Sequence, residues 1–194
     1  MKETQLKPSG RAPTFETHDW QGNPIEPFCS HPGMTLLSFF RYASCPLCNL
    51  RIRELITKHQ QFLESGIRIL AVFQSPLERI AHYVGTQSPP FPLIPDPDLK
   101  LYRLYGVESS WRGFARAWTL GIPQVYRAVV TNGFLPGTME NEIHRLPADF
   151  LIDRNGRLIE VYYGRDIGDH IPLEHLFSHS LNPTLKMERI SNRT

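Results

Sequence analysis

The segment that decides the fold is Leu36–Cys48, which reads LLSFFRYASCPLC. It begins with an apolar run short enough for a buried strand, continues through a brief turn, and ends with Cys45 and Cys48 at the start of a long amphipathic segment. If a helix begins there, its first backbone N–H groups lack intrahelical partners, and the helix dipole presents partial positive charge to Cys45. Both effects favour the thiolate, the form of cysteine that attacks peroxides and disulfides. Cys48 follows one turn later, so the spacing also allows a disulfide between the two.

Length and composition favour one domain with a full core, because the chain has 194 residues of which 41% are hydrophobic. The net charge is only +2, from 21 basic and 19 acidic residues, which argues against a general nucleic-acid binder. No apolar run approaches the roughly 18 residues that span a bilayer, and residues 1–8 lack the apolar core of a secretory signal. Three cysteines are too few for a secreted disulfide scaffold. We therefore expect a cytoplasmic protein without a membrane partner, in which a close cysteine pair is catalytic or binds metal.

The rest of the chain alternates strand and helix patterns. After a strand at residues 35–40, we expect a helix from the cysteines to about residue 65, with Ile52, Leu55, Phe62 and Leu63 on its apolar stripe. The later expected elements are a buried strand at 67–73, a helix begun by Ser75 as N-cap, a short strand at 93–94, a helix at 96–105, a hairpin of strands at 150–153 and 158–163, and a helix at 172–178. This order predicts an α/β fold with a parallel centre.

Residues 14–180 are expected to form the folded domain, between a flexible N-terminal arm at 1–13 and a polar tail at 181–194. Residues 107–146 interrupt the alternation of strands and helices, and we interpret them as a helical insertion. Trp111, Phe114 and Trp118 are spaced there for one helical face, which is the ordinary sign of packing onto a core. The same face, with arginines nearby, could instead dock a partner protein or an apolar hydroperoxide.

Four blocks in a fixed order resemble the peroxiredoxin-like (AhpC/TSA) branch of the thioredoxin-fold superfamily, over roughly residues 13–177. The blocks are CPLC at 45–48 after its strand, FPLIPDPD at 91–98, YGV at 105–107 and DFLIDRNG at 149–156. A C-x-x-C pair in a βαβ setting is itself typical of a thioredoxin-like redox motif. The resemblance implies a thioredoxin-like fold, with a central mixed sheet flanked by helices and a helical insertion before the last hairpin. It also implies a thiol-dependent oxidoreductase that needs no cofactor.

The active centre departs from the pattern P-x-x-x-T-x-x-C with which peroxiredoxins surround the attacking cysteine. Ser38 stands at the position of the family's proline and Tyr42 at that of its threonine. Pro147 occupies the place of the family's distant arginine, where thioredoxins keep a cis-proline. We therefore expect a cis peptide bond before Pro147. Arg41 or Arg145 would then supply a substitute cation.

The mechanism that follows uses Cys45 as the attacking thiolate, with Arg41 first among the arginines that can lower its pKa, before Arg51 and Arg53. With a hydroperoxide, Cys45 becomes a sulfenic acid that condenses with Cys48 and releases water. With a disulfide, it forms a mixed disulfide that Cys48 resolves. Either route needs an external thiol reductant of the thioredoxin or glutathione type. Both substrates remain open, as does a homodimer.

Several alternatives stand beside this interpretation. The cysteine pair could be half of a structural zinc site, although zinc needs four ligands and only Cys29 with His31 lies nearby. The chain could instead be a non-catalytic module that binds a partner through its insertion, or an inert relic of a redox fold. Cys29 is either a third redox partner or a small buried hydrophobe. His170 is either a proton donor or, with Asp169, a cap for the last helix.

Overall fold

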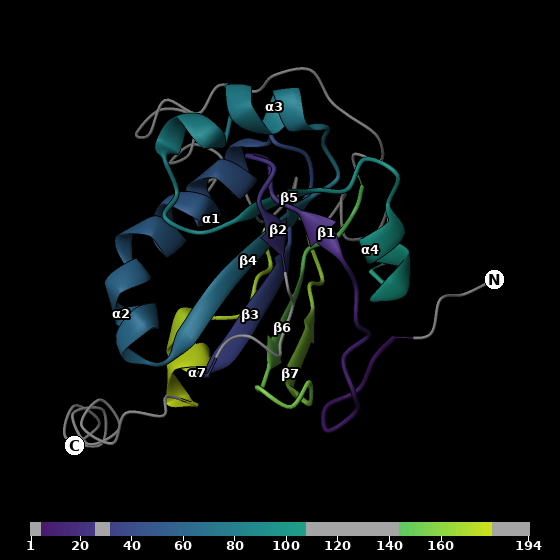
Figure 1. Cartoon of the computed structure of the whole chain (residues 1–194), viewed down its shortest axis with the longest axis vertical. Coiled ribbons are helices and arrows are strands. Elements are labelled where there is room, and N and C mark those ends of the chain that lie inside the picture. The colour runs from purple at the N-terminus through teal and green to yellow at the C-terminus, as the bar shows by residue number, and fades with distance from the viewer. Residues whose placement is uncertain (1–4, 26–31, 108–143, 180–194) are drawn as a thin grey trace.

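A five-stranded mixed sheet, in the order β5-β4-β3-β6-β7, forms the centre of the computed structural model, which describes residues 5–25, 32–107 and 144–179 (Figure 1). β3, β4 and β5 are parallel, and β6 is antiparallel to both β3 and β7. The mixed α/β sheet inferred from the sequence is thereby confirmed. The strands are β1 (Thr17–His18) and β2 (Pro24–Ile25), which form a separate hairpin, and β3 (Met34–Phe39), β4 (Ile67–Phe73), β5 (Leu93–Pro95), β6 (Ala148–Ile152) and β7 (Leu158–Tyr163).

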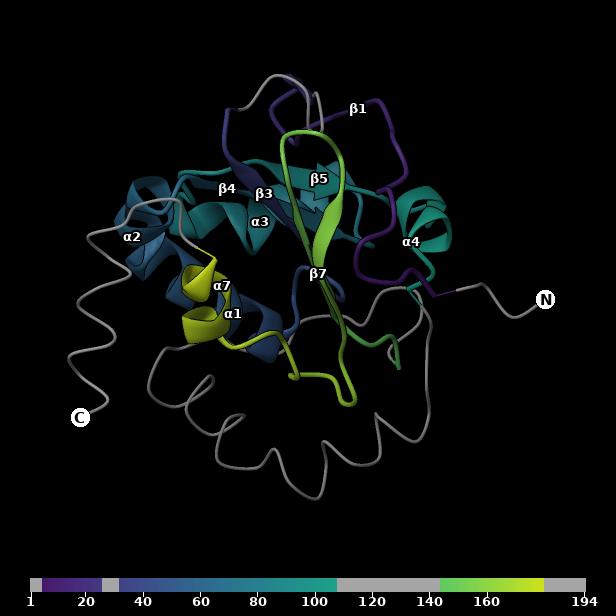
Figure 2. The same cartoon turned by 90° about the horizontal axis from the view of Figure 1, so that it is seen from below.

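Helices cover both faces of the sheet, and each face has its own apolar core (Figure 2). Ile52, Phe62, Ile80 and Leu176 anchor four helices to one face, and Tyr102 anchors a fifth to the other. β3 is buried at every residue because it lies between two strands and beneath helices on both sides. The helices on the first face are α1 (Pro46–Thr57), α2 (His59–Glu64), α3 (Leu77–His82) and α7 (Leu173–Ser178); α4 (Lys100–Leu104) lies on the second, and a 3₁₀ turn spans Gly85–Gln87.

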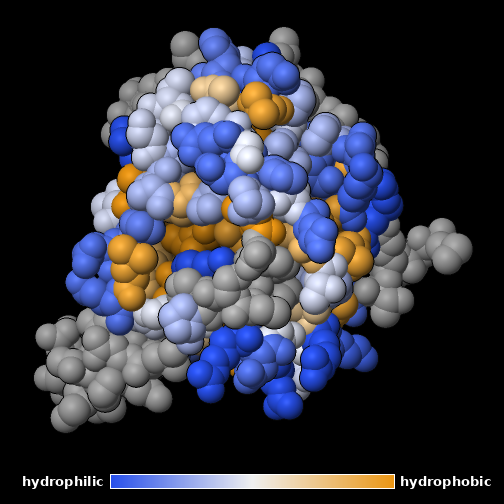
Figure 3. Space-filling model, in the orientation of Figure 1, coloured by the Kyte–Doolittle hydropathy of each residue, from blue (hydrophilic) through white to orange (hydrophobic). Residues whose placement is uncertain are grey.

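The helix that we expected to run unbroken to residue 65 is divided at Lys58 into α1 and α2. Leu63, which we placed on the buried stripe, is 51% exposed. It lines an apolar groove of about 420 Å³ between α2, the strands β2 and β4, and residues 90–92, which the surface view shows as a hollow (Figure 3). The described residues that line this groove do not include Cys45 or Cys48, so the groove is separate from the cysteine pair.

Two helix starts differ from the sequence prediction because tertiary contacts take over the polar groups. Ser75 does not cap α3; its hydroxyl accepts the Ala43 N–H at 2.8 Å, and Pro76 is the N-cap. The helix expected from residue 96 begins only at Lys100. Asp96 nevertheless serves its first turn, since the buried carboxylate accepts the N–H groups of residues 100, 101 and 102 at 2.9, 2.7 and 3.2 Å.

Part of the expected N-terminal arm is docked on the sheet. Ser9 N donates to Leu158 O at 2.8 Å, Leu158 N donates to Gly10 O at 2.9 Å, and Ala12 N donates to Gly156 O at 2.8 Å. Ala12 is also buried. Most of the predicted insertion, the C-terminal tail, Cys29 and His31 lie outside the described residues. No helix within the described ranges has the length and apolar character needed to cross a bilayer.

Candidate active site

The two cysteines lie where the predicted strand passes into the predicted helix. Cys45 is the N-cap of α1, with extended backbone angles (φ −71°, ψ 121°), and Pro46 opens the helix. Proline suits this position because its φ is already helical and its missing N–H would have had no partner. Cys48 is the third helical residue, so its sulfur lies on the same first turn as that of Cys45. This placement agrees with the sequence interpretation.

Cys45 is poised as a thiolate. Its pKa is lowered from the ordinary 9.0 to about 6, first by the hydrogen bond from the Cys48 thiol, against the opposing effect of burial. The positive charge of Arg41 and the backbone N–H groups of Cys48 and Leu47 lower the pKa further. Arg41 Nη1 donates to Cys45 Sγ at 3.4 Å. These are the helix N-terminus and the cation that the sequence suggested.

Cys48 has the opposite preference. Burial and the neighbouring Cys45 raise the pKa of the Cys48 thiol well above its ordinary value. The pair is therefore a thiolate in contact with a thiol at neutral pH, with the negative charge on Cys45. Both side chains are buried, with Cys45 1% and Cys48 2% exposed.

Tyr42, at the position of the family's threonine, remains protonated at neutral pH. Burial, and next the negative charge of Cys45, raise the pKa of its phenol to about 12. The Arg41 guanidinium lies over the Tyr42 ring, 4.9 Å from its centroid. Arg41 itself is 2% exposed, so a buried cation stands between the tyrosine ring and the thiolate.

Amide side chains secure the cysteine turn, and sequence reasoning missed them. Asn49 Nδ2 donates to Ala43 O at 2.7 Å and to Cys45 O at 3.0 Å. Gln87 Nε2 in turn donates to Asn49 Oδ1 at 2.9 Å. Asn49 is buried on the first turn of a helix, a place where an amide needs internal partners. That burial was the available signal, because it can be inferred from the spacing of the apolar stripe.

Pro147 does not have the predicted cis bond, since the described residues contain no cis peptide bond. Its carbonyl accepts the Gly164 N–H at 2.9 Å, which continues the pairing of β6 with β7 by one residue in trans geometry. Arg145, the other candidate cation, donates from Nε to Gln74 Oε1 at 3.1 Å and from Nη1 to Val107 O at 2.7 Å. The contact with the Cys45 sulfur is made by Arg41.

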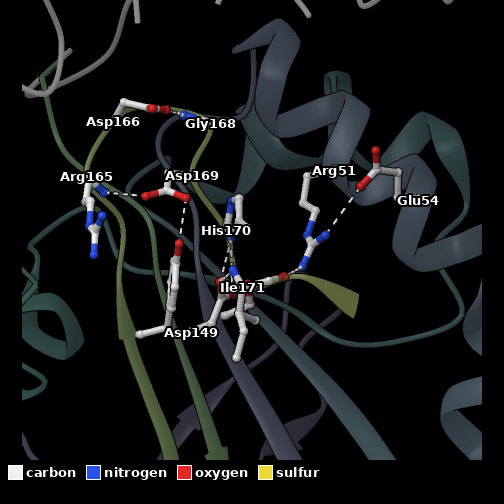
Figure 4. Close-up of polar contacts among 11 residues, drawn as sticks. Arg51, Glu54, Asp149, Arg165, Asp166, Gly168, Asp169, His170 and Ile171 are labelled. Atoms are coloured by element: carbon white, nitrogen blue, oxygen red, sulfur yellow. Dashed lines mark hydrogen bonds and ion pairs between the residues drawn. The ribbon is translucent and has the colours of Figure 1, made fainter. Parts of the chain in front are cut away.

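A buried carboxylate beneath the helices forms a second polar cluster (Figure 4). Asp149 is 1% exposed, accepts the Ser38 hydroxyl and the Ile171 N–H (2.8 Å), and lies 3.0 Å from His170 Nδ1. Burial would raise its pKa, but His170, Arg51 and Ser38 outweigh this effect and hold the pKa below its ordinary value. Ser38 and Asp149 are direct partners in the β3–β6 register. A polar residue within each of two largely apolar strands was the signal that could have paired them.

The same cluster corrects the expected cap of the last helix. Pro172 is the N-cap of α7, and neither Asp169 nor His170 caps it. Asp169 instead accepts the Tyr162 hydroxyl at 2.7 Å and the Arg165 N–H at 2.8 Å. Arg51, once a candidate neighbour of Cys45, donates to Ile171 O at 2.6 Å, so it ties α1 to the segment before α7 (Figure 4).

Within the described part of the chain, no third side chain completes a metal site at Cys45 and Cys48. Cys29, the other thiol weighed for such a site, lies outside that part.

Comparisons with known proteins agree with this geometry. The sequence model of the AhpC/TSA family matches residues 8–161. A Mycobacterium tuberculosis (strain H37Rv) protein, named as a proposed peroxiredoxin, is 23% identical over 170 residues, which cover 88% of this chain and 93% of that protein. Peroxidoxin BcpB from M. tuberculosis matches with a TM-score of 0.65 at 16% identity, over 90% of this chain and 96% of its own. A proposed thiol:disulfide interchange protein DsbE from Chlorobium tepidum matches with a TM-score of 0.60 at 18% identity, over 90% of this chain and 99% of its own. Both structural likenesses show the fold.

Proposed function

Because the chain belongs to the AhpC/TSA family, we propose that it is a thiol-dependent oxidoreductase that reduces a hydroperoxide with Cys45 and Cys48. The observation that carries the proposal is the state of Cys45: a buried sulfur in contact with Arg41 and the Cys48 thiol, with its pKa lowered to about 6. A thiol of this kind is mostly ionised at neutral pH, and the thiolate is the nucleophile. The family's peroxidase chemistry supports the same choice.

The proposed reaction has three reactants, the Cys45 thiolate, the Cys48 thiol and a hydroperoxide. The Cys45 thiolate attacks one peroxide oxygen, the O–O bond breaks, and an alkoxide leaves and takes a proton to become an alcohol. Cys45 is then a sulfenic acid. Cys48 attacks its sulfur, an S–S bond forms, the S–O bond breaks, and hydroxide leaves with the Cys48 proton as water. An external thiol reductant, either one dithiol of the thioredoxin type or two monothiols of the glutathione type, returns two electrons through thiol–disulfide exchange and is itself oxidised to a disulfide.

Arg41 is the group that we propose in place of the family's threonine and distant arginine. Its guanidinium reaches the Cys45 sulfur from the end of β3. A fixed cation there favours the thiolate and also stabilises the negative charge that develops on the leaving oxygen. We propose that Pro147 has a structural role, in which its carbonyl helps to align β6 with β7, and that it takes no part in the chemical steps.

Burial favours a small hydroperoxide over a protein disulfide as substrate. Attack on a disulfide requires a second protein to place a sulfur in line with Cys45, which is 1% exposed. A small hydroperoxide requires far less opening of the site. Thiol–disulfide exchange remains the second candidate, because Cys48 already contacts Cys45 on the first turn of α1 and is ready to resolve a mixed disulfide.

Stopped-flow oxidation of the reduced chain by hydrogen peroxide tests the proposal, with Cys45→Ser and Cys48→Ser as matched variants. Oxidation of Cys45 should exceed that of a free thiol by on the order of a hundredfold, as positioned charge commonly provides. Mass spectrometry should find the two cysteines linked in the unmodified chain, and Cys45 carrying one oxygen in Cys48→Ser. A rate no faster than that of a free thiol contradicts the peroxidase role, and rapid reduction of a disulfide substrate would then establish the second candidate. A biological effect that survives in Cys45→Ser would instead identify a non-catalytic module.

A further inference from the structure

Glu160 on β7, His175 on α7 and His179 at the C-cap of α7 lie together and take no part in the cysteine turn described above. Their ligand atoms, one from each side chain, all lie within 4.8 Å of one another. Glu160 Oε1 is 3.0 Å from His179 Nε2 and 3.6 Å from His175 Nε2. We propose that these three side chains form a binding site for a divalent transition-metal cation, for which Zn²⁺ is the natural probe.

An irregularity in β7 brings Glu160 to the helix. Ile152 is paired with Leu158 and Leu151 with Glu160, so β7 contains one more residue than β6 across this step. Leu158 packs in the core on the α4 face, whereas Glu160 contacts α7 on the opposite face. Two residues separated by two positions in a regular strand would share a face. The extra residue therefore turns Glu160 towards α7, and bulges elsewhere redirect single side chains in this way.

Helical spacing supplies the two nitrogens. His175 lies in α7 and His179 is the C-cap four residues later, so their side chains lie one above the other on one face of the helix. Their rings are 6.1 Å apart at the centroids and only 31° from parallel. Both direct Nε2 at the same carboxylate oxygen. Three residues from two elements thus converge on one point.

The distances from Glu160 Oε1 to the two histidine nitrogens suit a shared metal. A tetrahedral Zn²⁺ with bonds of about 2.0–2.2 Å holds its ligand atoms roughly 3.3 Å apart. The two histidine-to-glutamate separations, 3.0 and 3.6 Å, lie on either side of that value. Imidazole and carboxylate together are a donor set that suits zinc and its neighbours. The side chain of His175 is 56% exposed, so solvent reaches the site and water can provide a fourth ligand.

Such a metal would join α7 to β7. The helix has only six residues, of which Leu176 and Phe177 are buried in the core. The segment before it is held by the hydrogen bonds of Arg51 and Asp149 with Ile171. A metal bound by the folded state alone raises its apparent stability by mass action. The site therefore has two readouts, metal binding and thermal stability, and neither depends on peroxidase activity.

Isothermal titration of the full chain with ZnCl₂ tests the inference, in a protein without an affinity tag and with all three cysteines replaced by serine so that thiolates cannot bind. One Zn²⁺ should bind per chain. Affinity should fall at least tenfold in Glu160→Gln, His175→Ala and His179→Ala, and binding should vanish in the double histidine variant. His18→Ala, at an exposed histidine on β1, is the control and should bind as the parent does.

The unmodified chain provides a second measurement should the cysteine replacements disturb the core. With Co²⁺ as probe, a site of nitrogen and oxygen donors lacks the intense near-ultraviolet charge-transfer band of thiolate ligation. Zn²⁺ should also raise the Tm of the unmodified chain and not that of His175→Ala/His179→Ala. Absence of binding overturns the proposal, and so does equal affinity in the double variant. Either result would leave the three residues as a surface polar cluster.

Discussion

The charge state of a single sulfur depends here on which neighbours face it. Burial disfavours the Cys45 thiolate, so the pKa of about 6 requires that the Cys48 thiol, Arg41 and the helix N-terminus together outweigh burial. The folded pKa lies below the ordinary value of 9.0. The thiolate therefore stabilises the fold fully above about pH 9, and this contribution is lost as pH falls through about 6.

Replacing Arg41 by Met should raise the pKa of Cys45 and slow its reaction with peroxide at neutral pH. An opposite charge within about 4–6 Å typically shifts a pKa by 1–3 units, so we expect a rise of about one unit or more. Thiolate absorbance in the ultraviolet, followed against pH, gives the midpoint. Arg53→Met is the control, because Arg53 is an exposed cation on α1, the helix that begins at Cys45. Equal midpoints in both variants would remove Arg41 from the proposed role.

Several elements meet at the Asp149 carboxylate, which connects β6 with β3 through Ser38 and with the segment before α7 through His170 and Ile171. Asp149→Asn should destabilise the fold by about 3 kcal/mol, because a buried charge-assisted network loses its charge. Chemical unfolding at pH 7 measures the loss. Asp166→Asn, in the neighbouring loop, should change stability far less.

The same variant should also change the dependence of stability on pH. The pKa of Asp149 is lowered in the folded state. Its stabilising contribution is therefore complete above the ordinary carboxyl value of 3.8 and is lost as pH falls through the folded pKa. The difference between the parent chain and Asp149→Asn should stay constant near neutral pH and shrink below about pH 4. A difference that persists in strong acid would show that the effect is steric and not electrostatic.

The start of α4 depends on a carboxylate four residues upstream. Asp96→Ala should cost about 1–2 kcal/mol, because three N–H groups of the first turn lose their acceptor. Asp98→Ala is the matched control, since the Asp98 side chain is 70% exposed and its ion pair with Lys100 lies on the surface. Thermal unfolding distinguishes the two. Equal losses of stability in the two variants would mean that Asp96 acts only through its negative charge near the helix and not through its hydrogen bonds.

At the scale of the whole molecule, the docked N-terminal segment protects the end of the sheet. β7 is the last strand in the sheet order, and residues 9–12 hydrogen bond with Leu158 and Gly156 at its beginning. An uncovered edge strand presents unpaired backbone groups to other chains. The segment therefore contributes both to stability and to resistance against association through this edge.

Deleting residues 1–12 should lower stability by about 2–3 kcal/mol, which corresponds to roughly 5–10 °C in Tm, because three backbone hydrogen bonds are lost. Light scattering should also detect increased self-association. Deleting only residues 1–4 keeps all three bonds and is the control. If the two deletions behave alike, the docked segment contributes nothing to the fold.

The sequence by itself determined the order of the strands and helices in the central sheet and the place of the cysteine turn between a strand and a helix. The predicted strands at 35–40 and 67–73, the turn at 154–157 and the C-x-x-C spacing rest on local patterns, because hydrophobic periodicity, turn chemistry and helix polarity act over a few residues. Cys45 could be placed at the beginning of α1, and Arg41 beside it, because four residues of chain hold the two together.

Contacts between distant segments were decided only by the tertiary structure. Register places Ser38 opposite Asp149, packing gives the Ser75 hydroxyl to Ala43, and β7 gains one residue that turns Glu160 towards α7. In each case a polar group has several possible partners in the unfolded chain, and packing selects the one that gives it a partner in the folded state. That selection depends on the whole packed molecule and cannot be read from neighbouring residues.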